Sequence, residues 1–291
     1  MLVVSVLARK GGTGKSTAVR CFAVEALKAG RRVVVIDADP QPTCHRWGQR
    51  RAASGIAVPL VVVSGPGGLT AQVEGFRAQG VDLILVDTPP TATPAVNAAL
   101  DASTAAIIVT RPNPEDLESV QESLRVASAQ RRRCGVILWQ APPDKRVKAV
   151  TLAHEALKGM GAIVCPTAVS ASIAYPYAYA EGLTPQERDP EGRARAELAD
   201  VWAWLQRECI VATGSYDTVA ATPHGPVASV RGGRLAALPD GHGAVVPVSQ
   251  ATTAPRGHAA KLPVGHRTGV SDGHEAARLR GTMTKKASAR P

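Results

Sequence analysis

Short apolar runs alternate with amphipathic stretches along the first 210 residues. The runs predict strands at 2–8, 32–37, 59–63, 82–87, 105–110, 134–139 and 162–165. The stretches between them place apolar residues at helical spacing and predict helices at 15–29, 68–79, 93–101, 114–130, 145–159 and 192–208. The strands lack polar alternation, which is typical of strands buried on both faces. The pattern therefore predicts an α/β fold, with a mostly parallel twisted sheet covered by helices on both faces.

This pattern ends after Cys209. Residues 211–291 are rich in Gly, Pro, Ala, Thr, His and Arg, and Tyr216 is their only aromatic residue. A segment of this composition buries too little apolar surface to offset the entropy of ordering it. We therefore expect one folded domain at 1–210 and a basic, low-complexity, disordered tail at 211–291. A hairpin at 227–248 is the alternative for part of that tail.

Composition narrows the class of protein. The chain has 291 residues, of which 45% are hydrophobic and 20% charged, as expected of a globular protein. Its five cysteines form no C-x-x-C pair, which argues against a disulfide framework, a zinc site or an iron–sulfur site. No apolar stretch approaches the roughly 20 residues that span a bilayer, and no basic segment precedes the first strand. We expect a cytoplasmic protein.

Charge adds one hint about partners. The net charge is +10, and residues 212–291 contribute +6 of it, from ten Lys/Arg against four acids. The remaining +4 lies on the first 211 residues. A surplus on both parts is compatible with an acidic partner such as DNA, although charge alone does not identify one.

A glycine-rich segment follows the first predicted strand and opens the first predicted helix. The usual phosphate-loop pattern, G-x-x-x-x-G-K-[ST], would need glycine at position 9, where this chain has Arg9. Glycines let backbone N–H groups converge on phosphate oxygens, and the helix N-terminus adds positive potential. We expect Lys15 to reach the β- and γ-phosphates and the Ser16 hydroxyl to bind Mg²⁺. The segment as a whole is Lys10, Gly11, Gly12, Thr13, Gly14, Lys15, Ser16 and Thr17.

Two aspartate clusters follow predicted strands. One is Asp37-Ala38-Asp39-Pro40-Gln41 and the other is Asp87-Thr88-Pro89-Pro90. Parallel sheets bind ligands at the carboxyl ends of their strands, so both clusters belong beside the phosphate loop. A carboxylate in that place holds Mg²⁺ in nucleotide enzymes, which suits Asp87 acting through a metal-bound water. Asp39 is predicted near the γ-phosphate and the metal, where it would orient the attacking water.

With these motifs the chain resembles the ParA/MinD group of deviant Walker A ATPases, which are P-loop NTPases. Within that group it is most similar to the small ParA-type, ParF-like ATPases of plasmid partition. The residues that carry the resemblance are Lys10 to Thr17, Asp37 to Gln41 followed by Trp47, and Asp87 to Pro90. Weaker support comes from 110–116, 181–187 and 194–197. The resemblance covers about residues 1–208 and leaves the tail uncovered.

The resemblance implies a catalytic cycle. Two subunits sandwich two ATP molecules, and the extra lysine, Lys10, reaches across to the partner's phosphates. The ATP-bound homodimer binds DNA without sequence preference, and a centromere-binding adaptor stimulates slow hydrolysis. The chain departs from the family pattern at Thr13, which is commonly apolar, and at Ser16, which is commonly Thr. We expect both changes to be tolerated, because position 13 contributes mainly backbone and Ser16 keeps the metal ligand.

The resemblance leaves the DNA and adenine contacts less defined. Candidate DNA contacts are Arg131, Arg132 and Arg133, with a second group, Arg46, Arg50 and Arg51, beyond the second strand. The basic tail is a third candidate. A nucleoid-associated location would follow from such contacts. Gln140 and Thr167 are the candidate adenine contacts, from their places after the sixth and seventh strands.

The alternative is a MinD-like membrane-associated positioning ATPase, which shares every nucleotide motif. It would need an amphipathic C-terminal helix, whereas Thr282 to Pro291 are polar and basic. An apolar stripe within 193–208 is expected to pack on the core instead, so no membrane partner is expected. The tyrosines at 175, 177 and 179 are expected in a packed loop, which argues against a tyrosine kinase with a tyrosine-rich tail.

Overall fold

The computed structural model describes residues 1–65, 67–90, 94–144 and 148–210. The expected tail, 211–291, lies outside the described residues. The strands are β1 (Leu2–Leu7), β2 (Val33–Asp37), β3 (Leu60–Val63), β4 (Leu83–Asp87), β5 (Ala105–Thr110), β6 (Arg133–Leu138) and β7 (Ile163–Val164). The helices are α1 (Lys15–Lys28), α2 (Thr43–Ala53), α3 (Leu69–Ala78), α4 (Pro94–Ala102), α5 (Pro114–Ala129), α6 (Ala149–Gly159), α7 (Ala174–Ala180), α8 (Pro185–Arg188) and α9 (Arg193–Leu205), which continues as a π-helix (Gln206–Ile210).

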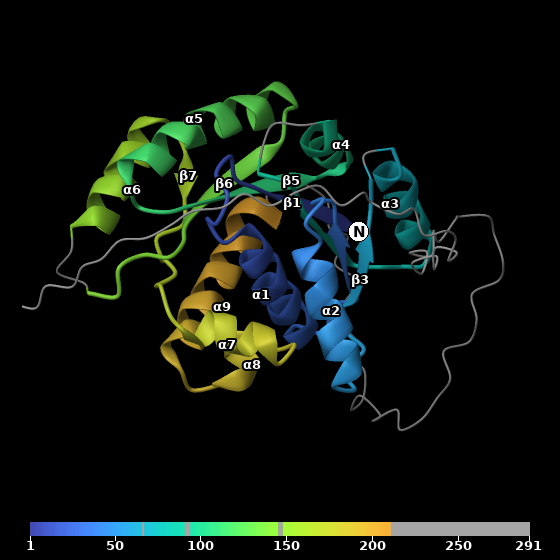
Figure 1. Ribbon diagram of the computed structural model, residues 1–291. Coiled ribbons are helices and arrows are strands. Elements are labelled where there is room, and N and C mark those ends of the chain that lie inside the picture. Colours follow the sequence, from blue (N-terminus) through green and yellow to red (C-terminus); the bar gives the residue numbers. More distant parts are fainter. Residues whose placement is uncertain (66, 91–93, 145–147, 211–291) are drawn as a thin grey trace, which may run out of the picture. The chain divides into compact units, whose positions relative to one another are not determined.

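The strands form one seven-stranded sheet in the order β3-β2-β4-β1-β5-β6-β7 (Figure 1). Every paired strand is parallel. In this register Asp37 at the end of β2 lies opposite Asp87 at the end of β4, and Val6 of β1 lies opposite Asp87. The predicted α/β class and parallel sheet are confirmed, and the two aspartate clusters meet at one edge.

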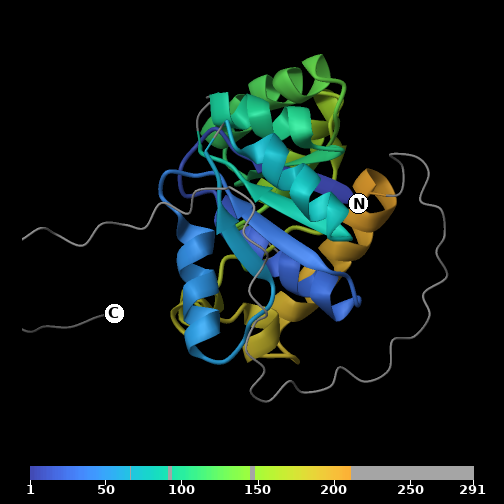
Figure 2. The ribbon, with the colours of Figure 1, turned by 90° about the vertical axis from the view of Figure 1, so that its right-hand side faces the viewer.

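Helices cover both faces of the sheet. Helices α1, α2 and α9 lie on one face, with α7 and α8 beside them, and α3 to α6 lie on the other (Figures 1 and 2). Alternate residues of β1 divide between the two sides, since Val4 and Val6 belong to the cluster under α1 and α9 while Val3 belongs to the cluster under α3. Burial on both faces explains why the strands are predominantly apolar.

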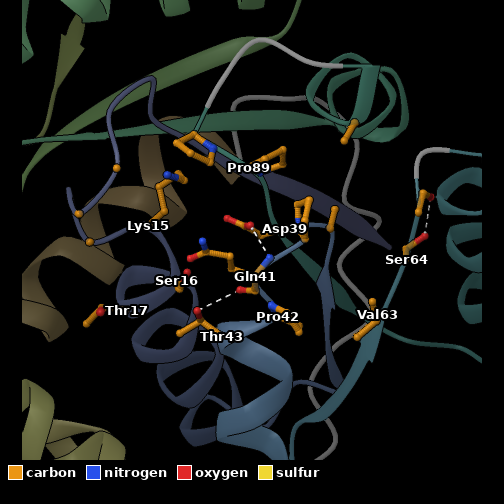
Figure 3. A pocket seen from close by; sticks show the side chains of 18 of the residues that line it. Lys15, Ser16, Thr17, Asp39, Gln41, Pro42, Thr43, Val63, Ser64 and Pro89 are labelled. Atoms are coloured by element: carbon orange, nitrogen blue, oxygen red, sulfur yellow. Dashed lines mark hydrogen bonds between the residues drawn. The ribbon is translucent and has the colours of Figure 1, made fainter. Parts of the chain in front are cut away.

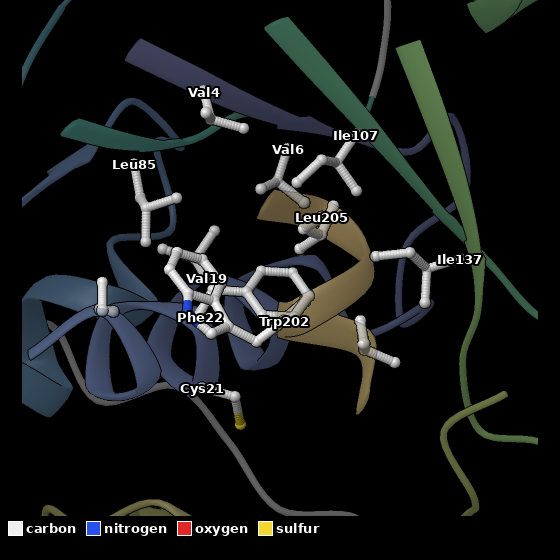
Figure 4. Packing of buried hydrophobic residues seen from close by; sticks show 14 of the residues in the cluster. Val4, Val6, Val19, Cys21, Phe22, Leu85, Ile107, Ile137, Trp202 and Leu205 are labelled. Carbon is white, nitrogen blue, oxygen red and sulfur yellow. The ribbon is translucent and has the colours of Figure 1, made fainter. Parts of the chain in front are cut away.

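The core beneath α1 and α9 is built around Phe22. Its ring stacks on Trp202 at 6.3 Å between centroids and meets Trp139 edge-on at 6.1 Å (Figure 4). The stripe on α9 is buried in this cluster through Leu198, Val201, Trp202, Trp204 and Leu205. It therefore packs on the core, as predicted. Across the described residues, every helix is too short or too polar to cross a bilayer.

Three helices were not predicted. Helix α2 buries only Cys44, Trp47 and Arg51, which follow helical spacing but include a charged residue, so the apolar pattern misses it. Helices α7 and α8 are short, at seven and four residues. The prediction of a loop for the tyrosines is wrong, since Tyr175, Tyr177 and Tyr179 lie on α7. Helix α6 begins later than predicted, at Ala149, and residues 145–147 lie outside the described residues.

Candidate nucleotide site

A cleft of about 1010 Å³ opens at the carboxyl ends of β1, β2 and β4 (Figure 3). The phosphate-loop segment forms one wall, and the turn after β2 forms another. Figure 3 shows Lys15, Ser16 and Asp39 pointing into the same space. The lining residues are Gly11, Gly12, Gly14, Lys15, Ser16, Thr17, Ala38, Asp39, Pro40, Gln41, Pro42, Thr43, Val63, Ser64, Gly65, Pro89, Pro90, Pro94, Ala95 and Gln140. The structure thus brings most of the predicted phosphate-site residues together.

Glycine is required where the loop turns into α1. Gly14 has φ 101°, in the left-handed region, and a Cβ there would lie 2.5 Å from Cδ1 of Trp139. Trp139 is buried at the end of β6, so it supports the loop from beneath. No pattern in the sequence links these two positions. Thr13 is buried and donates its hydroxyl to the Lys10 carbonyl oxygen at 3.4 Å, which leaves it outside the cleft wall.

Lys15 is the first residue of α1 and is 7% exposed. Burial lowers its pKa, while the charges of Asp87 and Asp39 act in the opposite direction. The ammonium group therefore lies close to both carboxylates at the N-terminus of a helix. This placement suits a cation that binds phosphate oxygens.

Asp87 lies beneath the loop and is fully buried. Burial raises its pKa to about 6, against the effect of a hydrogen bond from Ser16. Its Oδ2 accepts a hydrogen bond from the Cys44 thiol at 3.2 Å, whereas its Oδ1 is buried without a hydrogen-bond partner. An unpaired buried carboxylate oxygen beside a hydroxyl fits a hard cation such as Mg²⁺. Ser16, Asp87 and Asp39 are the residues that would hold it.

Asp37 organises the turn that carries Asp39. Its carboxylate accepts hydrogen bonds from the backbone N–H of Asp39 at 3.2 Å and of His45 at 2.9 Å. The Asp39 carboxylate in turn accepts from the Gln41 N–H at 2.8 Å. Burial raises the pKa of Asp37, and the backbone hydrogen bonds oppose that rise. This role was missed, although an Asp two residues before a turn is a known signal for it.

Cys44 was also missed. The ligand atoms of Asp37, Cys44 and Asp87 all lie within 4.8 Å of one another, and all three side chains are buried. The thiol is protonated, since burial and the neighbouring carboxylate of Asp87 raise its pKa well above the ordinary value. Cys44 therefore donates to the carboxylate of Asp87.

Lys10 points away from the cleft toward the start of α5. Its Nζ lies 3.4 Å from Oε2 of Glu115 and 3.4 Å from Oδ1 of Asp116. Asp116 is also bound by Arg111, with Nε to Oδ2 at 2.5 Å. Burial alone would raise the pKa of Asp116, but Arg111 and Lys10 lower it. In this state Lys10 is held within its own subunit.

The two candidate adenine contacts differ in their position relative to the cleft. Gln140 lines the cleft and donates from Nε2 to the Gly12 carbonyl oxygen at 2.9 Å. Thr167 is half-buried and is not among the residues that line the cleft. The adenine role of both residues stays a prediction.

The arginine triplet spans the turn from α5 to β6, and two of its members are engaged with the backbone. Arg132 donates to the Asp101 carbonyl oxygen at 3.0 Å, and Arg133 donates to that of Glu208. Arg131 is exposed. The role of the triplet in DNA binding stays a prediction.

Arg51 is 2% exposed and cannot serve as a surface contact, so that candidate is wrong. It forms a bidentate pair with Glu187, at 2.9 Å for each bond, and donates to the carbonyl oxygens of Gly182 and Val58. Nearby, Trp47 donates to the Leu183 carbonyl oxygen at 3.1 Å. These bonds fasten α2 to the segment around α8.

Known proteins share this architecture. The McdA–ATP complex of Cyanothece superposes with TM-score 0.55 and 17% identity, over 71% of this chain and 95% of that structure. MinD of Pyrococcus horikoshii, solved with Mg-ADP, has TM-score 0.58 and 17% identity, over 74% of this chain and 99% of that one. At these identities the likeness supports the fold alone.

Comparison of sequences identifies the family, whereas the structural likeness supports only the fold. Maintenance of carboxysome distribution protein A of Gloeobacter kilaueensis is 33% identical over 188 residues, which are 62% of this chain and 82% of that protein. The chromosome-partitioning ATPase Soj of Thermus thermophilus is 28% identical over 143 residues, which are 40% of this chain and 57% of that protein. The model of the CobQ/CobB/MinD/ParA nucleotide binding domain matches residues 4–164. The chain belongs to this ParA/MinD family of P-loop ATPases.

Proposed function

We propose that this chain is a Mg²⁺-dependent ATPase of DNA partition. In this proposal ATP drives dimerisation, the dimer binds DNA without sequence preference, and slow hydrolysis stimulated by a centromere-binding adaptor resets it. Residues 1–210 form the ATPase domain and 211–291 a basic tail. A nucleoid-associated cytoplasmic location follows from DNA binding.

One observation carries the ATPase part: Lys15, Ser16 and Asp39 line a single cleft at the end of a parallel sheet, and Asp87 is buried next to Ser16 beneath it. When bound, Mg²⁺-ATP supplies the phosphoanhydride and a metal that neutralises its charge. Lys15 and the loop N–H groups bind the phosphates, while Ser16 and Asp87 hold the metal side of the site. Asp39 orients water, and its carboxylate is positioned for this by Asp37 and the Gln41 N–H.

Lys10 is held by carboxylates of its own subunit, which is why we propose that it acts on phosphates only in a dimer. Within one subunit Lys10 pairs with Glu115 and Asp116, so it does not reach the phosphates of its own cleft. In a dimer, the phosphates of the nucleotide bound to the second subunit would compete with Glu115 and Asp116 for Lys10. Such a cation supplied in trans contributes about 10³–10⁵ to hydrolysis in other nucleotide enzymes.

The names of the two relatives differ in the cargo, that is, in the structure that each protein distributes or partitions. The name of the Gloeobacter protein refers to carboxysome distribution and that of the Thermus protein to chromosome partitioning. We propose DNA as the surface on which the dimer acts. A MinD-like positioning ATPase remains the alternative, and vesicle binding separates the two.

The test measures ATP hydrolysis and ATP-dependent co-pelleting with arbitrary duplex DNA for the wild type, Lys10→Ala and Asp39→Ala. We expect Lys10→Ala to lose partner-stimulated turnover. Asp39→Ala should remain an ATP-bound dimer on DNA. Arg9→Ala is the matched control, because Arg9 adjoins Lys10 and lies 4.0 Å from Glu122 on α5.

Full turnover in Lys10→Ala would refute the trans-lysine mechanism. Co-pelleting with anionic vesicles in place of DNA would favour the membrane alternative. Failure of the wild type to hydrolyse ATP with Mg²⁺ present would overturn the proposal as a whole.

A further inference from the structure

The structure separates the arginines that bind carboxylates or backbone oxygens from those that do not. Arg51, Arg132 and Arg133 bind carboxylates or backbone oxygens. Arg46 and Arg50 are exposed on α2 and, within the described part of the chain, form no ion pair. They are four residues apart, so they lie on the same side of the helix. This side of α2 is therefore a surface with uncompensated positive charge.

Helix α7 adds aromatic rings to that surface. The ring of Tyr179 lies between two guanidinium groups, with the Cζ atoms of Arg20 and Arg50 each 4.4 Å from its centroid. Tyr177, also on α7, is 57% exposed. The acidic neighbour, Glu181, is already paired with Arg188 at 3.0 Å. We call Arg20, Arg46, Arg50, Tyr177 and Tyr179 the α2–α7 basic surface.

Arg20 is an independent sign that this surface takes an anion. The residue is 7% exposed, its Nη1 is buried without a partner, and no carboxylate among the described residues pairs with it. A buried charge is normally paired, because burying it alone is costly. An external anion that binds next to Tyr179 would offset that cost through its charge.

The same surface is joined to the nucleotide cleft at two points. Arg20 donates from Nη2 to the hydroxyl of Thr17 at 2.9 Å, and Thr17 lines the cleft. Helix α2 begins at Thr43, which also lines the cleft, directly after the turn that carries Asp39. A nucleotide in the cleft would therefore lie beside Thr17, which contacts Arg20 of α1, and beside the start of α2.

We propose that the α2–α7 basic surface binds the phosphate backbone of duplex DNA. The inference rests on the proposed function and moves the contact away from the Arg131–Arg133 triplet. Arg46 and Arg50 contact phosphates directly, Tyr177 packs against the sugar–phosphate edge, and Arg20 strengthens the local positive potential. Phosphate contacts of this kind carry no sequence information, which suits nonspecific binding.

The test uses the full chain with Mg²⁺-ATP and a fluorescent duplex of arbitrary sequence, with anisotropy read over a range of salt concentrations. The variant is Arg46→Gln/Arg50→Gln. The charge-matched control is Arg131→Gln/Arg195→Gln, which removes two exposed arginines elsewhere, one of them from the triplet. A third variant, Arg46→Lys/Arg50→Lys, keeps both charges. Binding of a fluorescent ATP analogue checks that each variant is folded.

We expect Arg46→Gln/Arg50→Gln to bind DNA about tenfold or more weakly at 0.1 M salt. Its salt slope should fall in magnitude by about 2 for each subunit that contacts the duplex, one for each lost phosphate contact. The control should keep the wild-type slope, and the lysine variant should recover most of the affinity.

Three results would overturn the inference. In the first, the wild type binds DNA and Arg46→Gln/Arg50→Gln binds with the same affinity and slope, which leaves the proposed function intact. In the second, the control loses as much as the variant. In the third, the variant loses binding to phosphatidylglycerol vesicles but not to DNA, which reassigns the surface to lipid. A wild type that hydrolyses ATP but binds no duplex would instead refute the DNA part of the proposed function, and this inference with it.

Discussion

Gly14 is the residue at which the phosphate loop packs against Trp139, directly after β6. We expect Gly14→Ala to destabilise the nucleotide-free protein by about 2–4 kcal/mol, from backbone strain at φ 101° and from the clash with Trp139. Nucleotide binding should be lost with it. Urea unfolding measures the first effect and a fluorescent ATP analogue the second.

Gly11→Ala is the control for stability, because a Cβ at Gly11 meets nothing within 4 Å and its φ is not in the left-handed region. Equal losses of stability in the two variants would contradict the role assigned to Trp139.

Asp87 makes the stability of the metal-free protein depend on pH. Its pKa is about 6 in the folded state, against an ordinary value of 3.8. The folded state therefore keeps the proton longer, and stability falls as pH rises from about 4 to about 6. Asp87→Asn removes this effect, so it should be more stable than the wild type by about 3 kcal/mol at neutral pH and equal to it near pH 4. Denaturant unfolding in EDTA at several pH values measures the difference.

Asp82 directly precedes β4, the strand that ends at Asp87, and its effect on the pH dependence of stability should be the opposite. Hydrogen bonds and charge from Arg32 lower its pKa, against the effect of its burial. Asp82→Asn should therefore lose stability relative to the wild type above the ordinary pKa of 3.8 and match it at lower pH.

For Asp87, a profile of stability against pH that runs parallel in Asp87→Asn and in the wild type would show that burial of the Asp87 carboxyl is not costly.

The residues expected to bind phosphate and metal could be predicted because each belongs to a local sequence pattern. Lys15 and Ser16 follow a glycine loop between a strand and a helix, and Asp39 and Asp87 follow buried strands. Cys44 could not be predicted, because its hydrogen bond to Asp87 joins residues that are 43 positions apart.

At the scale of elements, α2 is fastened to the segment around α8 by the buried ion pair between Arg51 and Glu187. Glu187→Gln should cost about 3 kcal/mol or more, because it leaves the guanidinium of Arg51 buried without a counter-charge. Denaturant unfolding gives the value. Glu181→Gln is the control on the same segment, since its pair with Arg188 is exposed and should contribute at most about 1 kcal/mol. Similar costs for both variants would show that Arg51 is stabilised by its carbonyl partners alone.

Strands were easier to predict than helices in this chain. A strand covered on both faces is apolar along nearly its whole length, as in β4 and β5, where only the last residues, Asp87 and Thr110, are polar. Helix α2 is different, because one of its three buried positions is Arg51, whose charge is matched only when Glu187 packs against it. A pattern of apolar residues does not register such a helix.

At the scale of the whole molecule, the cis pairs of Lys10 oppose its proposed role in the dimer. Glu115→Gln removes one of them at a side chain that is 86% exposed. Because an exposed pair contributes at most about 1 kcal/mol and the dimer releases two of them, we expect ATP-dependent dimerisation to be favoured by up to about thirtyfold. Analytical ultracentrifugation in an Asp39→Ala background, which prevents turnover, measures the dimer constant.

Glu118→Gln is the control for that change, since Glu118 is exposed on the same helix and pairs with no cation among the described residues. Weaker dimerisation in Glu115→Gln would mean that Glu115 assists the dimer instead of restraining Lys10.

The sequence by itself determined the α/β class, the parallel sheet, the phosphate loop and the two aspartate turns. Each of these features can be recognised from residues that are adjacent in the sequence, where strand, loop and helix follow one another. Only the tertiary structure decided which cations are free. Lys10 meets Glu115 across 105 residues, and Arg51 meets Glu187 across 136. Such pairings follow from how helices pack on the sheet, and the local periodicity that predicts an element carries no information about its distant neighbours.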